Sequence, residues 1–104
     1  MILRAKGWSV EQTPRSRDGG VDLVATRLDE IGLEQRLFVQ CKDHARAVGV
    51  EVVRELLGVI PAGASVQAVL ASPSGVTADA ARLARERNVR IWDEAALLDL
   101  ESSA

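Results

Sequence analysis

Cysteine is nearly absent from this sequence, and so are long apolar runs. The single cysteine, Cys41, excludes an internal disulfide and a four-thiolate zinc site. No apolar run approaches the roughly 20 residues that span a bilayer. The N-terminal residues also contain no apolar run long enough for a signal peptide. We therefore expect a cytoplasmic protein, from a reducing compartment, with no membrane partner.

The sequence also lacks an excess of positive charge. Its 13 basic and 15 acidic residues give a net charge of −2. A domain that held nucleic acid by bulk electrostatics would be basic, so any nucleic-acid site must be local. Eleven of the basic residues are arginine, and only Lys6 and Lys42 are lysine. Lysine at position 42 is therefore unusual in a chain whose basic residues are mostly arginine.

The order of apolar and polar residues predicts one α/β domain over residues 1–104. No repeat, low-complexity tract or linker divides the chain. Apolar spacing predicts strands over 8–12, 21–27 and 36–42, a helix from Val50 to about Ile60, and a buried strand over 65–71. A helix with its N-cap at Thr77, a strand over 89–92 and a last helix capped by Asp93 follow. The first half should form an antiparallel meander and the second half parallel neighbours, giving a mixed sheet flanked by helices.

Two polar residues end the strand predicted over 36–42. Alternation puts Leu37, Val39 and Cys41 on an apolar face that we expect in the core, and Phe38, Gln40 and Lys42 on the other face. A hairpin symmetric about Gly32 would place Asp22 opposite Lys42 and Val24 opposite Gln40. Neighbours on one face lie within roughly 4.5–8 Å. We therefore predict that Asp22, Gln40 and Lys42 form one cluster beside the glycine-containing loop over 13–20.

Such a cluster suits metal-assisted hydrolysis of a phosphodiester. Asp22 and the side-chain oxygen of Gln40 would hold a hard cation, Mg²⁺ or Mn²⁺. The metal would polarise the phosphate and lower the pKa of an attacking water. Lys42 would orient that water or stabilise developing negative charge, a role that the broad guanidinium of arginine fits poorly. The alternatives are that Asp22 fixes a turn and that Gln40 and Lys42 belong to a solvated strand face.

The segments Gly20-Val21-Asp22 and Val39-Gln40-Cys41-Lys42 resemble the catalytic signature of the Mrr-type branch of the PD-(D/E)xK nucleases. In that branch a glutamine commonly replaces the acidic residue of the E-x-K element. The likeness covers nearly the whole chain and includes residues 7–8, 18–22, 48–58 and 71–77. It implies a restriction-endonuclease-like fold, catalytic roles for Asp22, Gln40 and Lys42, and the Cys41 backbone carbonyl as a further metal ligand.

The chain departs from this family at its N-terminus. Only six residues precede Gly7 and none is acidic, so we expect these residues to form only the end of the family's first helix. We expect either a fragment of a longer protein or an enzyme impaired by the short helix. The expected partner is DNA, together with a homodimer mate or a separate target-recognition domain or subunit. Loop residues that adjoin the site supply the candidate DNA contacts, which are Arg15, Arg17, His44 and Arg46.

The sequence leaves three functions open. The favoured one is a Mg²⁺-dependent DNA endonuclease of the restriction or defence type, similar to type IV restriction enzymes. The second is a catalytically inactive remnant of the fold that serves as a DNA-binding or assembly module. The third is a nucleotide-binding domain that uses the turn over 72–77. The intact set of Asp22, Gln40 and Lys42 favours the first function, and the short N-terminus favours the second.

Overall fold

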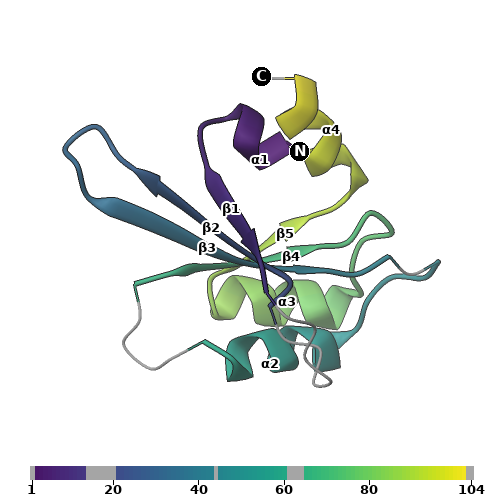
Figure 1. Ribbon diagram of the computed structural model, residues 1–104. Helices are drawn as coiled ribbons and strands as arrows, with labels where there is room; N and C mark the ends of the chain where they lie inside the picture. The colour runs from purple at the N-terminus through teal and green to yellow at the C-terminus, as the bar shows by residue number, and fades with distance from the viewer. Residues whose placement is uncertain (1, 14–20, 44, 61–64, 103–104) are drawn as a thin grey trace.

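The computed structural model describes residues 2–13, 21–43, 45–60 and 65–102 (Figure 1). In chain order the elements are α1 (Ile2–Ala5), β1 (Ser9–Gln12), β2 (Leu23–Leu28), β3 (Glu34–Cys41), α2 (Val50–Gly58), β4 (Gln67–Ala71), α3 (Ala78–Glu86), β5 (Val89–Trp92) and α4 (Glu94–Ser102). The five strands form one sheet in sequence order, antiparallel from β1 to β3 and parallel from β3 to β5. This confirms the predicted mixed sheet. No helix in the described ranges is long and apolar enough to cross a membrane.

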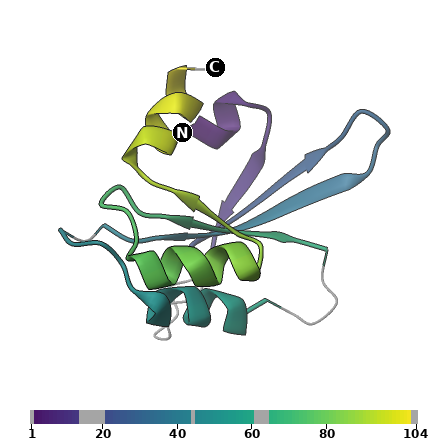
Figure 2. The same ribbon diagram turned by 180° about the vertical axis from the view of Figure 1, so that it is seen from behind.

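Both faces of the sheet are covered, as β4 shows. Ala68 and Leu70 pack into a cluster with residues of α2 and α3, whereas Val69 and Ala71 pack into a second cluster on the opposite face. Helices α1 and α4 lie on that second face (Figures 1 and 2). Contacts on both sides explain the nearly continuous apolar run of this strand. The predicted buried strand is confirmed, although it begins at Gln67 and not at residue 65.

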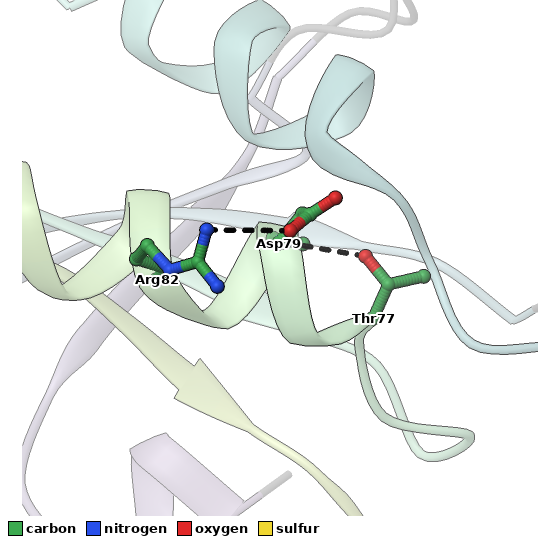
Figure 3. Close-up of polar contacts among 4 residues, drawn as sticks. Thr77, Asp79 and Arg82 are labelled. Carbon is green, nitrogen blue, oxygen red and sulfur yellow. Dashed lines mark hydrogen bonds and ion pairs between the residues drawn. The ribbon is translucent and has the colours of Figure 1, made fainter.

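Small and branched side chains hold α2 and α3 to the sheet. Helix α2 buries Val52, Val53 and Leu56. In α3 the buried residues are Ala80 and Ala84, whose small side chains let the helix lie close to its neighbours. Thr77 caps α3 as predicted, because its Oγ1 accepts a hydrogen bond from Ala80 N–H at 3.2 Å. Asp79 and Arg82 form an ion pair at 3.5 Å on the exposed side of the helix (Figure 3).

The hairpin of β2 and β3 differs from the predicted one in register. It is centred on Ile31, not on Gly32, as shown by the paired residues Leu23–Val39, Val24–Phe38 and Leu28–Glu34. Asp29 shapes the turn, since its Oδ1 accepts hydrogen bonds from the N–H groups of Ile31 and Leu33 at 3.0 and 2.9 Å. The tip is not packed against the core, and Ile31 is 80% exposed. At the tip, turn chemistry therefore sets how the two strands are joined.

Leu56 should be one of the most important side chains for stability. It is 0% exposed and lies in the cluster between α2, α3 and the sheet. We expect Leu56→Ala to lower the free energy of unfolding by about 2–5 kcal/mol, because it removes buried methyl groups and leaves a cavity. Leu98→Ala is the matched control, since Leu98 also lies on a nine-residue helix but is 57% exposed. Urea unfolding should show little change for the control, and equal losses in the two variants would contradict the assignment of this core.

Candidate active site

The candidate site lies at the end of β3, between its antiparallel neighbour β2 and its parallel neighbour β4. Strand β3 ends in Gln40 and Cys41, Lys42 follows, and Asp22 directly precedes β2. Backbone hydrogen bonds continue past the strand ends. Asp22 N–H donates to the Val39 carbonyl and Lys42 N–H donates to the Ala71 carbonyl, both at 2.9 Å. The main chain that carries the site is therefore fixed from both sides.

The Asp22 carboxylate is held against the end of β3. Its Oδ2 accepts a hydrogen bond from the backbone N–H of Cys41 at 2.7 Å. Asp22 is half-buried, and its carbonyl accepts a hydrogen bond from Thr13 N–H at 2.9 Å at the end of β1. Within the described ranges, no group donates to the other carboxylate oxygen, Oδ1. The strand thus orients the carboxylate through one of its two oxygens.

Gln40 lies on a covered face of the sheet. It is 1% exposed, and it stands in register with Leu70 of β4. Leu70 packs into the cluster with α2 and α3, and residues in register on adjacent strands share a face. Gln40 therefore does not belong to a solvated strand face. Lys42, two residues further on, is half-buried at the rim of the same region.

The observed register changes which of the predicted residues are neighbours. The register ends at the pair Leu23–Val39, and Asp22 N–H donates to the Val39 carbonyl, so the predicted direct pairing of Asp22 with Lys42 is wrong. The structure thus brings Asp22 to the strand end that carries Gln40 and Lys42. One cluster of all three side chains stays a prediction.

Cys41 is exposed, so its predicted place in the core is wrong. The apolar cluster on its face ends with Val39 and Ala71, and Cys41 lies beyond it. Partial desolvation raises the pKa of the Cys41 thiol, and the nearby Asp22 carboxylate raises that pKa further. The thiol is therefore accessible but mainly protonated at neutral pH.

The alkylation rate of Cys41 should report on the Asp22 carboxylate. Because thiolate is the nucleophile, a raised pKa should make labelling by iodoacetamide at pH 8 slower in the folded protein than in the urea-unfolded chain. Asp22→Asn should speed labelling of the folded protein by removing the nearby charge, while desolvation keeps it below the unfolded rate. Asp43→Asn is the control, since Asp43 is an exposed acid near by in sequence. Equal rates in the two variants, measured in EDTA, would contradict the Asp22–Cys41 geometry.

Of the four candidate DNA-contacting residues, the structure describes one, Arg46. Arg15, Arg17 and His44 lie outside the described residues. Arg46 is described, and its side chain is exposed in the loop that leads from Lys42 to α2. Its carbonyl accepts a hydrogen bond from the Ser74 hydroxyl at 2.8 Å. Sequence reasoning missed this contact, because nothing in the serine-containing turn indicates which loop it meets.

The turn over 72–77 uses its hydroxyl groups within the protein. Ser72 is completely buried and its hydroxyl donates to the Gly75 carbonyl at 2.9 Å. Ser74 donates to the Arg46 carbonyl, and Thr77 caps α3. These internal contacts favour a structural role for the turn over the phosphate-binding role of the nucleotide alternative.

The arrangement of strands and helices matches that of solved endonucleases. The DNA modification-dependent restriction endonuclease AspBHI superposes with a TM-score of 0.74 at 22% identity, over 92% of this chain and 26% of its own. The MspJI restriction endonuclease in complex with a 27-mer oligonucleotide gives 0.66 at 15% identity, over 95% and 24%. A repair endonuclease from Pyrococcus abyssi gives 0.63 at 18% identity, over 88% and 40%. At these identities the likeness establishes a restriction-endonuclease-like fold, and the chain spans less than half of each of these proteins.

The sequence itself gives the family. Residues 1–100 match the restriction endonuclease family defined by the Mrr catalytic domain. The chain therefore belongs to that family. No curated protein matches it by sequence.

Proposed function

We propose that this chain is the catalytic domain of a metal-dependent DNA endonuclease of the restriction or defence type. The observation that carries the proposal is the hydrogen bond from Cys41 N–H to the Asp22 carboxylate at 2.7 Å. This contact brings the single acid of the proposed site to the strand end that bears Gln40 and Lys42. Family membership and DNA-cleaving structural neighbours support the same function.

The oxygen atoms near Asp22 fit a hard cation. Asp22 offers Oδ1 of its carboxylate, and Gln40 offers a buried amide oxygen. The Cys41 backbone carbonyl is the third proposed ligand. Within the described ranges no three His, Cys, Asp or Glu residues gather as a ligand group. A cation here would therefore depend on one carboxylate with neutral oxygens and water, which suits Mg²⁺ or Mn²⁺ because Mg²⁺ usually keeps several waters.

The chain's own residues have separate tasks in the proposed reaction. A bound dication would supply Lewis acidity toward the scissile phosphate and its attacking water. Asp22 is fixed by its hydrogen bond to the strand, so its other oxygen, Oδ1, would need little reorganisation to bind the cation. Lys42 provides a compact, half-buried ammonium that stabilises the extra negative charge of the pentacovalent phosphorane. Through this phosphorane-like transition state, the P–O bond to the leaving oxygen breaks as the bond to the water oxygen forms. The proton lost by the water passes to solvent, and solvent protonates the leaving oxygen.

A cleavage assay tests the proposal. Supercoiled plasmid, methylated and unmethylated, is incubated with the purified chain in Mg²⁺ or Mn²⁺ and, in parallel, in EDTA. We expect nicked or linear DNA only with the metal. Binding of the plasmid without cleavage in any metal would favour the remnant, a DNA-binding or assembly module, and neither binding nor cleavage would overturn both. Asp22→Asn, which should lose cleavage, guards against a contaminating nuclease.

A further inference from the structure

Two loops are joined at the edge of the candidate site. One leads from Lys42 to α2, and the other leads from β4 to α3. They meet at the site end, where Lys42 N–H donates to the Ala71 carbonyl at 2.9 Å. They meet again at the helix end, where Val48 N–H donates to the Gly75 carbonyl at 3.0 Å and Thr77 N–H donates to the Val48 carbonyl at 2.9 Å. The loop after Lys42 is thus fastened at both ends to the turn after β4.

A side-chain hydrogen bond holds the loop between these two ends. The Ser74 hydroxyl donates to the Arg46 carbonyl at 2.8 Å. Ser74 lies in a compact turn that two hydrogen bonds close. Gly75 N–H donates to the Ser72 carbonyl, and the Ser72 hydroxyl donates to the Gly75 carbonyl, both at 2.9 Å. Ser72 is completely buried. The contact therefore fixes the Arg46 backbone to a rigid part of the fold.

The Arg46 side chain has the properties of a phosphate contact. It is exposed. Among the described residues, the two ion pairs are Arg36–Glu34 and Arg82–Asp79, and Arg46 belongs to neither of them. Its backbone is four residues beyond Lys42 on a loop that begins at the site. In a chain of net charge −2, cations that face DNA must be local and well placed. A fixed backbone lowers the entropy lost when a long side chain takes up one contact.

We propose that Ser74 is a positioning residue for DNA binding, and that it acts by holding Arg46 where the guanidinium contacts a backbone phosphate beside the scissile bond. This inference rests on the proposed function, because it takes DNA to be the ligand at the edge of the candidate site. It adds a residue, Ser74, that touches no substrate. Its effect must then pass through Arg46.

A double-mutant cycle tests this coupling. Binding of a fluorescein-labelled DNA duplex is measured by anisotropy, with Ca²⁺ in place of Mg²⁺ so that the duplex stays intact. Ser74→Ala should raise the Kd about three- to tenfold and flatten the log Kd against log salt slope by up to about 0.9, the value for one phosphate contact. In the Arg46→Ala background the same substitution should have no further effect. Ser74→Thr, which keeps the hydroxyl, should restore binding, and in cleavage the loss should fall on KM with kcat unchanged.

Ser102→Ala is the matched control, because it also removes one serine hydroxyl bound to a carbonyl, that of Asp99 at 3.2 Å, in α4. An unchanged Kd for Ser74→Ala would overturn the inference. So would an equal loss in the presence and absence of Arg46, since that pattern means a general loosening of the fold. A parent chain that binds no DNA at all would overturn the proposed function and this inference with it, whereas the first two results leave the function standing.

Discussion

Lys42→Ala is expected to remove most DNA cleavage while the protein still folds and still binds metal. Lys42 is half-buried at the end of β3, and its backbone is fixed by the hydrogen bond to Ala71. The substitution deletes the ammonium and leaves this backbone contact in place. Loss of one preorganised electrostatic or proton-transfer group costs about 10²–10⁴-fold in rate. We therefore expect kcat to fall by about that factor.

The chain's composition provides controls for this variant. Lys6, the only other lysine, lies in the connection from α1 to β1, so Lys6→Ala should cleave at the parental rate. Lys42→Arg keeps the charge but replaces a compact ammonium with a planar guanidinium, and it should recover only part of the activity. Single-turnover plasmid cleavage with a calorimetric metal titration measures both quantities. Parental cleavage by Lys42→Ala would remove this residue from the mechanism.

Gln40→Glu should lower the melting temperature of the metal-free protein and increase the stabilisation that metal gives. Gln40 is 1% exposed, so the variant places a carboxylate where water has almost no access. An uncompensated buried charge costs several kcal/mol, and we expect a lower melting temperature in EDTA than that of the parent. A cation bound by Asp22 and the new carboxylate at position 40 would compensate this charge, so Mg²⁺ or Mn²⁺ should stabilise the variant more than the parent. Each tenfold gain in metal affinity adds about 1.4 kcal/mol at saturating metal.

The comparison with Gln40→Ala separates binding from folding. This variant removes the amide oxygen without adding charge and leaves Asp22 in place, so metal should bind it more weakly and stabilise it less than the parent. Thermal unfolding in EDTA and over a metal titration gives both readings for all three chains. If the three chains gain the same stabilisation from metal, Gln40 is not a ligand, and the inactive remnant becomes the better description of this domain.

The sequence predicted those parts of the fold that depend on apolar pattern and capping. Residues 68–71 are apolar on both faces and form the buried part of β4, which begins two residues later than predicted, at Gln67. Asp93 caps the last helix as predicted, with its Oδ1 accepting from Ala96 N–H at 2.9 Å. Both features follow from local residue chemistry alone. They need no knowledge of distant neighbours.

The predictions that were wrong concern features that the local order of apolar and polar residues does not determine. The way the two strands of the hairpin are joined depends on hydrogen bonds from Ile31 and Leu33 to Asp29, which a symmetry argument about Gly32 could not include. Cys41 continues an apolar alternation, yet the covering elements stop short of it. The bond between Ser74 and Arg46 spans 28 residues and depends on how two loops meet. Such contacts are set by the assembled sheet.

The position of the site at the change from antiparallel to parallel pairing has a consequence for the order of folding. Cys41 N–H is secured by Asp22, 19 residues earlier and across a hairpin, a unit that closes within about 1–10 μs. Lys42 N–H is secured by Ala71 after the crossover through α2, and such non-local pairing forms later because its loop must be closed first. We therefore expect these two adjacent amides, at the end of β3 and directly after it, to be secured at different stages of folding. During synthesis we expect the carboxylate to take its place at the Cys41 amide before the backbone of Lys42 is held, so that the site becomes complete only when β4 has docked.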